Sequence, residues 1–313
     1  MRTAFIETLC ELAEQDERIW LLTGDLGYSV LERFANRFPR RFINVGVAEQ
    51  NMTGLAAGLS FCDKIVFTYS IANFPTLRCL EQIRNDVCYH NLNVKIVAVG
   101  GGFAYGAQGM THHATEDLAI MRALPNMTVV APGDPVETRL ATRAIVNWRG
   151  PCYLRLGKAG EPVVHQTPPA FTIGKAITVR EGSSVTLIST GGMLHNVIQA
   201  AELLEQQRIQ ARVLSMHTLK PLDREAVLTA ARETGSIVTI EEHGVTGGLG
   251  SAVAEVLAEE KNLQVPLLRF GVADDVHKMV GSQDFLLKKS GLSVHDLVGG
   301  ICDNIAQGKR CEQ

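Results

Sequence analysis

The sequence predicts an α/β protein of two domains, each with a mainly parallel sheet flanked by helices. Short apolar, β-rich runs alternate with helix-length segments along the chain, which is typical of parallel sheets. The alternation stops over residues 160–183, where three prolines, several glycines and polar residues indicate a connection between domains. A chain of 313 residues also suits two domains of roughly 100–200 residues each. We therefore expect a first domain over 1–165, a linker over 166–183 and a smaller second domain over 184–313.

The expected strands are the apolar runs themselves, because β-branched residues favour a pleated, buried surface. They cover 19–22, 65–69, 94–99, 127–131 and 152–156 in the first domain, and 185–189, 212–215, 236–240 and 266–269 in the second. After the first strand of the second domain, apolar residues at 194, 197, 198, 201 and 204 follow the spacing of one helix face.

The composition excludes several classes of protein. The chain is 46% hydrophobic and 20% charged with a net charge of -3, which excludes a disordered chain, a fibrous rod and a strongly basic nucleic-acid binder. Its mean hydropathy of +0.07 suggests apolar surface that a partner covers, so we expect an oligomer. The seven cysteines never form a CxxC pair, which indicates reduced thiols in the cytoplasm. We find neither a signal peptide nor an apolar run of about 18 residues, and expect no membrane partner.

Glu49 is the first candidate site residue. It follows Gly46-Val47-Ala48 at the start of a helix whose Gly54, Ala56, Ala57 and Gly58 allow close approach of another backbone. One interpretation is a carboxylate stabilised by the helix dipole. The other is a carboxyl group buried against a partner, where desolvation raises its pKa and lets it share a proton.

Two further candidates follow apolar strands, whose carboxyl ends face the ligand crevice in parallel sheets. Phe74 offers a ring face to a heterocycle, although a lone Phe is more often a core residue. The glycine-rich loop 100–113 ends in His112 and His113, which favour proton transfer or hydrogen bonding over a metal site because no third ligand cluster supports one. This loop does not open a helix directly, as a dinucleotide fingerprint requires.

The segment Thr239–Gly250 runs from a strand through glycines into a helix. Its glycines resemble those of a phosphate-binding loop. It lacks the Lys-Ser/Thr of a P-loop and a full GxGxxG, so we favour a structural turn between the strand and the helix. We find no GxSxG elbow and no ordered Cys/His pair, and a covalent protein nucleophile is not supported.

Taken together, these segments resemble the transketolase family, specifically its C-terminal half: a pyrimidine-binding domain followed by the transketolase C-terminal domain. The resemblance runs from Arg2 to about Val276 and rests on five motifs in order: GVAEQN, EQIRND, the glycine loop ending in THH, PNMTVVAPGD and TIEEHGVTGGLGSAVAEVL. The family uses thiamine diphosphate, so the resemblance implies this cofactor and the transfer of a two-carbon ketol unit between sugars or sugar phosphates.

For the cofactor, the resemblance implies roles for five residues. Glu49 resembles the carboxyl that hydrogen-bonds the aminopyrimidine nitrogen and favours the imino tautomer that removes the thiazolium proton. Phe74 resembles the aromatic that stacks on the pyrimidine. Asp25 matches a position lining the cofactor channel, and Ile71 and Arg78 are also placed at the cofactor.

For the substrate, the resemblance implies a second set. His112 matches the histidine that contacts the substrate oxygen near the reacting carbon, and Ser29 lines the channel. Arg2 and Arg155 match arginines that grip a sugar phosphate, a role suited to the guanidinium fork. Gln108 stands where an aspartate usually binds the hydroxyl next to the donor carbonyl.

The family's diphosphate-binding domain has no counterpart in this sequence. Its Gly-Asp-Gly motif is echoed only by GDL at 24–26, followed by Asn51, which we interpret as a coincidence. The resemblance therefore implies a split transketolase: a separate N-terminal subunit holds the diphosphate and its Mg²⁺ or Ca²⁺, this chain holds no metal, and the assembly is a heterotetramer.

Departures from the family pattern bear on the substrate. Ile71 and Leu77 replace aromatics around the pyrimidine, and Gly100 replaces a phosphate-contacting histidine, which predicts substrates unlike the ordinary pentose phosphates. The alternatives are a 2-oxo acid dehydrogenase beta subunit, a deoxyxylulose-phosphate-synthase-like enzyme and a non-catalytic scaffold subunit. Retention of Glu49, Phe74 and His112 argues against the scaffold.

Overall fold

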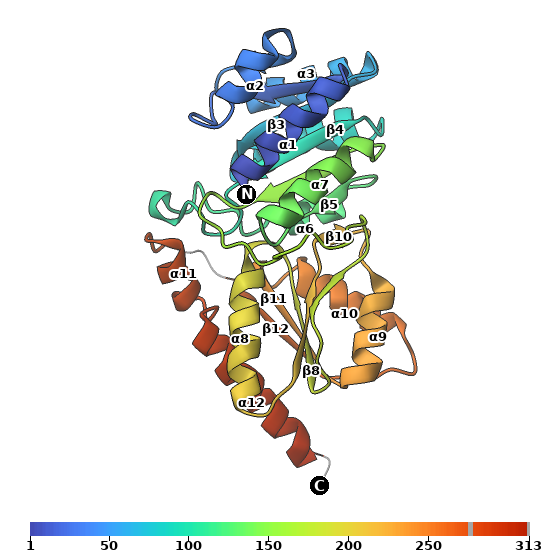
Figure 1. Ribbon diagram of the computed structural model, residues 1–313, viewed down its shortest axis with the longest axis vertical. Helices are drawn as coiled ribbons and strands as arrows, with labels where there is room; N and C mark the ends of the chain where they lie inside the picture. The colour runs from blue at the N-terminus through green and yellow to red at the C-terminus, as the bar shows by residue number, and fades with distance from the viewer. Residues whose placement is uncertain (275–277, 312–313) are drawn as a thin grey trace.

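The computed structural model describes residues 1–274 and 278–311, with side chains up to residue 306. It contains two sheets, one above the other in Figure 1. The first has the order β10 (Thr218–Lys220), β5 (Thr128–Val130), β6 (Cys152–Leu156), β4 (Val94–Val99), β3 (Ile65–Ile71), β1 (Ile19–Thr23), β2 (Phe42–Asn44). The second has the order β12 (Leu267–Val272), β11 (Ile237–Gly244), β8 (Val185–Ser189), β9 (Ala211–Ser215), β7 (Ile177–Arg180). The end of the resemblance, at Val276, lies outside the described residues.

Both sheets are mainly parallel, as expected. The exceptions are β10, which is antiparallel to β5, and β7, which is antiparallel to β9. The nine expected strands all form, with ends that differ by a few residues. Three strands were not predicted, β2, β7 and β10, and each has only three or four residues.

The helices cover both faces of each sheet. Those of the first domain are α1 (Arg2–Gln15), α2 (Glu32–Arg37), α3 (Glu49–Phe61), α4 (Asn73–Leu77), α5 (Leu80–Gln82), the π-helix η2 (Ile83–Cys88), α6 (Asp117–Ala123) and α7 (Pro135–Asn147). Those of the second are α8 (Leu194–Gln206), α9 (Arg224–Thr234), α10 (Leu249–Glu259), α11 (Gln283–Lys289) and α12 (Val294–Cys311). Short 3-10 turns are η1 (Pro39–Arg41), η3 (Gly106–Gln108) and η4 (Gly191–Met193). In Figure 1, α8 and α12 lie on one side of the second sheet and α9 and α10 on the other.

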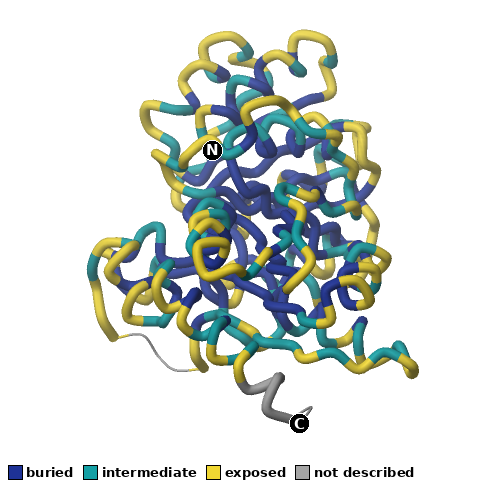
Figure 2. Tube along the Cα trace, turned by 60° about the horizontal axis from the view of Figure 1, so that its bottom comes forward, coloured by how far each residue is buried: buried dark blue, intermediate teal, exposed yellow. Residues whose placement is uncertain are grey.

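The two domains share a hydrophobic core. One cluster lies between the first sheet and α1 and α7, and includes Phe5, Leu9 and Phe67. A second cluster begins at Met52 of α3 and continues through α6 to Val253 of α10, so it crosses from one domain to the other. Figure 2 shows the buried trace running without a break through the middle of the molecule. The domains therefore pack as one body.

The connection between the domains is tied down by polar contacts. Residues 157–176 form no helix or strand, and the predicted linker 166–183 contains strand β7. The carboxylate of Asp134 accepts hydrogen bonds from the backbone N–H groups of Val164 and His165. His165 Nε2 lies 2.8 Å from Glu137 Oε1, and the ring of Phe171 stacks on that of His217 with centroids 3.9 Å apart.

The buried His217 gives this connection a pH dependence. Burial lowers the pKa of His217 to about 4 from an ordinary value of 6.5, although Glu137 and Asp223 oppose this effect. The folded state therefore holds a neutral imidazole where the unfolded chain takes up a proton. The contribution of His217 to the free energy of unfolding is fully present above pH 6.5. It is lost as the pH falls toward 4, and the total loss is about 3 kcal/mol.

We expect His217→Asn to reduce the loss of stability between pH 6.5 and pH 4. Asn keeps a polar atom near the Thr218 hydroxyl, which lies 2.9 Å from His217 Nδ1, but it does not titrate. Urea unfolding at a series of pH values measures the slope for both proteins. The Glu137 carboxylate raises the pKa of His165, so His165 contributes to the pH dependence of stability with the opposite sign. Both proteins contain this pair, and its contribution therefore cancels in the comparison. Equal slopes would contradict the assignment.

Candidate functional site

The site is built around the carboxyl group of Glu49 at the first residue of α3. Glu49 is 1% exposed, and its Oε2 accepts a hydrogen bond of 2.7 Å from Arg78 Nη1. The other oxygen, Oε1, is buried and has no hydrogen-bond partner among the described residues. Gly24 leaves room for this side chain, because a Cβ at residue 24 would lie 3.3 Å from Glu49 Cγ. A buried carboxyl oxygen without a partner costs about 1–3 kcal/mol, which a donor from a ligand would recover.

Phe74 lies beside this carboxyl group on α4. The guanidinium of Arg78 lies 4.5 Å from the centroid of the Phe74 ring, so Arg78 connects the ring to Glu49. Phe74 is only half-buried and therefore is not an ordinary core residue. Ile71, at the end of β3, is also half-buried, two residues before the first turn of α4.

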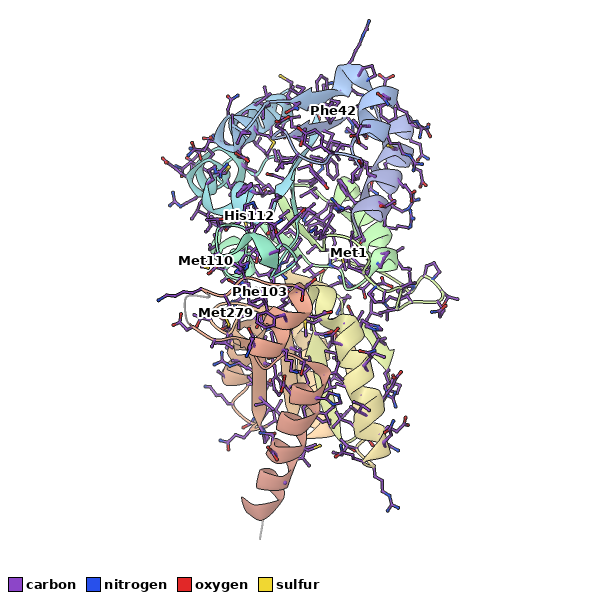
Figure 3. The ribbon with its side chains drawn as sticks, turned by 90° about the vertical axis from the view of Figure 1, so that its left-hand side faces the viewer. Met1, Phe42, Phe103, Met110, His112 and Met279 are labelled. Carbon is purple, nitrogen blue, oxygen red and sulfur yellow. The ribbon has the colours of Figure 1, made fainter. Side chains whose placement is uncertain are left out.

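His112 also contacts Phe74. The two rings meet edge to face with centroids 5.1 Å apart, and Asn73 Nδ2 holds the loop by donating to the Thr111 carbonyl. The hydroxyl of Thr111 lies 3.0 Å from His112 Nδ1, which leaves Nε2 without a hydrogen bond to any described residue. Glu49, Phe74, Arg78 and His112 thus form one cluster, and Figure 3 shows His112 near the junction of the domains.

His113 differs from His112 although the two are adjacent. It is buried, its Nε2 lies 3.4 Å from the Gly106 carbonyl, and its ring packs edge to face on Phe103. The side chain of His113 therefore holds the fold of the glycine loop. Of the two histidines, His112 is the one placed beside Phe74.

Asp25 and Ser29 lie in an exposed loop after β1. Both have positive φ angles, 58° and 62°, which few residues other than Gly and Asn adopt. Asp25 is held by Asn44, whose Nδ2 donates to its carboxylate at 3.0 Å, and Ser29 N donates to Glu32. Asp25 directly follows Gly24, which contacts Glu49, so the loop reaches the edge of the cluster.

Two predicted substrate residues, Arg2 and Gln108, lie at the start of α1 and at the end of the turn η3. Arg2 is half-buried at the start of α1 beside Tyr69, and its Nε has no hydrogen-bond partner in the described chain. Gln108 is exposed in the turn η3 of the glycine loop. No contact places either residue directly on Glu49, within residues 1–274 and 278–311.

Arg155 lies in the interior, where the protein itself binds two of its guanidinium nitrogens. It is 5% exposed, and its Nε donates to Asp117 Oδ2 at 2.8 Å. Its Nη2 donates to the carbonyls of Ala114 and Glu242. Burial disfavours the charge of Arg155, but the Asp117 carboxylate outweighs that effect and raises its pKa. These contacts give Arg155 a role in supporting the site, and its predicted role at a sugar phosphate stays a prediction.

The glycine loop is also held by Glu242, which was not among the predicted site residues. Glu242 accepts hydrogen bonds from Phe103 N at 2.7 Å and from Gln283 Nε2. Gly102 is required here, because a Cβ would lie 2.4 Å from Glu242 Cδ and its φ is +63°. Nothing in the local sequence of Glu242 distinguishes it from Glu241; only the packing of the second domain on the loop does.

The segment Thr239–Gly250 is a structural turn, as favoured. The carboxylate of Glu241 accepts hydrogen bonds from Leu249 N at 2.7 Å and Gly250 N at 2.8 Å, at the start of α10. The helix N-terminus is thereby satisfied by the protein itself.

Neither a metal centre nor a membrane span is found in the described part of the chain. Among the described side chains, no group of three His, Cys, Asp or Glu residues is arranged to hold a metal ion. No helix within residues 1–274 and 278–311 combines the length and the apolar character needed to cross a bilayer.

Comparison with known proteins decides the family. The model of the transketolase pyrimidine binding domain matches residues 1–160, and that of the transketolase C-terminal domain matches residues 174–297. The chain belongs to the transketolase family. The predicted resemblance and the two-domain α/β fold are thus confirmed. The transketolase domain order places Glu49, Phe74 and His112 in the pyrimidine-binding domain.

Several similar proteins are named as parts of transketolases. A 6-deoxy-6-sulfo-D-fructose transketolase subunit of a Clostridium species is 44% identical over 299 residues, covering 95% of this chain and 92% of that protein. A subunit of an apulose-4-phosphate transketolase from Phocaeicola vulgatus is 42% identical and covers 88% of each chain. A solved split gene transketolase, described as an inactive beta4 tetramer, superposes with a TM-score of 0.88 at 43% identity and 97% coverage of both chains.

Longer relatives contain the same half. A 1-deoxy-D-xylulose-5-phosphate synthase of Desulfitobacterium hafniense is 36% identical over 93% of this chain, which spans only 46% of that protein. This chain therefore corresponds to one half of such an enzyme.

We expect Arg155→Met to destabilise the protein by about 3–5 kcal/mol, because it leaves the Asp117 carboxylate buried without its partner. Urea unfolding measures the free-energy change. Arg143→Met is the matched control, since Arg143 pairs with Glu11 on the surface, and such pairs contribute at most about 1 kcal/mol. A similar small loss for both variants would contradict the structural assignment of Arg155.

Proposed function

We propose that this chain is the C-terminal subunit of a two-component transketolase and that it supplies the pyrimidine side of a thiamine diphosphate site. The observation that carries the proposal is the unpartnered Oε1 of Glu49, buried beside the half-exposed ring of Phe74. This pair fits an aminopyrimidine, whose ring nitrogen and exocyclic amine need a polar partner while its face needs an apolar one. When bound, the cofactor supplies the carbanion that transfers a two-carbon ketol unit.

Each residue of the cluster has a role that follows from its contacts. Oε1 of Glu49 would hold the pyrimidine nitrogen through a shared proton, while Arg78 orients the carboxyl group through Oε2. Phe74 provides the stacking surface, and Arg78 on its ring fixes its position. His112 presents Nε2 toward the substrate as a hydrogen-bond donor or acceptor, because Thr111 already binds Nδ1.

The missing part of the site is a second subunit. Exposed apolar side chains before α3, on α3 and at the end of α4 support a covered surface: Val47 is 74% exposed, Leu55 36% and Leu77 49%. Gly54 and Gly58 leave that face of α3 open, since a Cβ at either would meet nothing within 4 Å. We infer that an N-terminal diphosphate-binding subunit packs here, holds the divalent metal and completes a heterotetramer in the cytoplasm.

The substrates are proposed to be sugars or sugar phosphates. The two transketolase subunits named above as similar carry the names of a sulfonated and a phosphorylated sugar, and Gly100 and Gln108 depart from the pattern for ordinary pentose phosphates. The synthase relatives keep a decarboxylating reaction as a second candidate. Comparing turnover on ketose donors with turnover on 2-oxo acids separates the two.

We expect Glu49→Gln to lower ketol transfer by at least ~10²-fold in the reconstituted complex, because the amide cannot share the proton. Steady-state rates measure the effect, and Glu17→Gln, at an exposed position, is the control. Unchanged activity of the Glu49 variant would support a scaffold subunit instead.

The chain purified alone should neither bind thiamine diphosphate tightly nor turn over, because it provides only one side of the cofactor. Titration of thiamine diphosphate with magnesium into the isolated chain, and then into the chain with its partner, measures both properties. Tight binding and full turnover without a second polypeptide would refute the split-site proposal.

A further inference from the structure

A short segment of the second domain, residues 280–286, lies along the glycine loop of the first. The backbone N–H of Gly281 donates to the carbonyl of Gly106 at 3.3 Å. A Cβ at residue 106 would be 2.5 Å from Leu286 Cδ1 and 2.7 Å from Gly281 O. Any side chain at residue 106 would therefore push this segment away from the loop.

Gln283 fixes the segment to the loop through a buried carboxylate. Its Nε2 donates to both oxygens of Glu242, at 3.0 Å and 2.9 Å. The Glu242 side chain is 4% exposed, and it also accepts a hydrogen bond of 2.7 Å from Phe103 N in the loop. Burial raises the pKa of Glu242, whereas the charge of Arg155 and these two donors oppose that effect. The carboxylate therefore joins the amide of Gln283 to the backbone of Phe103.

A row of contacts continues from Phe103 to His112, and both residues lie near the domain junction (Figure 3). The ring of Phe103 meets that of His113 edge to face with centroids 5.2 Å apart, and His113 Nε2 lies 3.4 Å from the Gly106 carbonyl. The preceding residue is His112, whose backbone N–H donates to the Gly109 carbonyl at 2.9 Å. Because Phe103 is fully buried, a shift of its ring moves His113 and with it the backbone of His112.

We propose that Gln283 is a positioning residue for ketol transfer and that it acts on His112 from the second domain. Its effect passes through the Glu242 carboxylate and the backbone of Phe103. A displacement of about 1 Å at a reacting group can lower a rate by up to ~10²-fold, so a contact outside the site is sufficient to control it. The inference rests on the proposed transketolase function.

Exchanging the two hydrogen-bonding groups tests the pair in the reconstituted complex. Gln283→Glu places a second carboxylate against Glu242, and the repulsion separates the segment from the loop. We expect kcat for ketol transfer to fall about tenfold, while Kd for thiamine diphosphate does not change. Adding Glu242→Gln should restore kcat, because the new amide donates to the carboxylate at residue 283 and still accepts from Phe103 N.

Two further variants exclude a general loss of stability. Gln283→Met removes the donor without adding charge, so it should give a smaller fall in kcat in a folded protein, which urea unfolding verifies. Gln206→Glu is the matched control, because Gln206 is exposed at the end of α8 and should keep the wild-type kcat. A wild-type kcat in both Gln283 variants, or a double variant as slow as Gln283→Glu alone, would overturn the inference.

Hydrogen exchange separates this inference from the function on which it rests. Mass spectrometry of the same complex should show faster amide exchange of residues 101–113 in Gln283→Met, with unchanged exchange of residues 49–61 in α3. If the complex transfers no ketol unit at all, the proposed function fails, while faster exchange of the loop still supports the role of Gln283 in holding it. Exchange of the loop at the wild-type rate would overturn that role.

Discussion

The buried ion pair between Arg155 and Asp117 connects the segments on which the site depends. Arg155 extends from β6, Asp117 begins α6, and the same guanidinium reaches the carbonyls of Ala114 and Glu242. Ala114 also pairs with Gly102 in an isolated bridge that closes the base of the glycine loop. Because the charge is desolvated, it is tolerable only with all of these partners in place. The position of the loop that ends in His112 is therefore set by contacts that the protein makes with itself.

The second domain serves the first by holding this loop. Phe103 is fully buried among side chains of the second domain, including Leu286 and Val272, and Glu242 binds its backbone N–H. Gly106 contacts Leu286 and Gly281, which lets α11 pack directly on the loop. Figure 3 shows Phe103, Met110, His112 and Met279 gathered at the domain junction. A domain that carries none of the proposed cofactor contacts thus controls where a proposed catalytic histidine lies.

The sequence predicted the strands well because β3, β4 and β8 are mostly apolar runs that are almost entirely buried. Short β2, β7 and β10 lack such runs and form only because a neighbouring strand offers hydrogen bonds. The helix start at Glu49 was predictable from its position after Gly46-Val47-Ala48. That Oε1 is buried with no hydrogen-bond donor among the described residues depends on tertiary packing. Family resemblance assigns positions without contacts, so it did not indicate the buried ion pair of Arg155 with Asp117. The contact of the Tyr105 ring with Gly100, where a Cβ would lie 2.1 Å from Tyr105 Cε2, left no local signal in the sequence.

Strand β10 belongs by sequence to the second domain, yet it forms the edge of the first sheet by pairing with β5. Together with the apolar cluster that runs from α3 to α10, it makes the two family domains a single cooperative unit. A pyrimidine-binding domain excised at the linker would expose β5 as a free sheet edge and part of its core to water. Such edges invite pairing with other chains. The two domains are separate units in the sequence, but the first does not have a complete sheet without the second. A fusion of the pyrimidine-binding domain to another protein would therefore require a strand that replaces β10 beside β5.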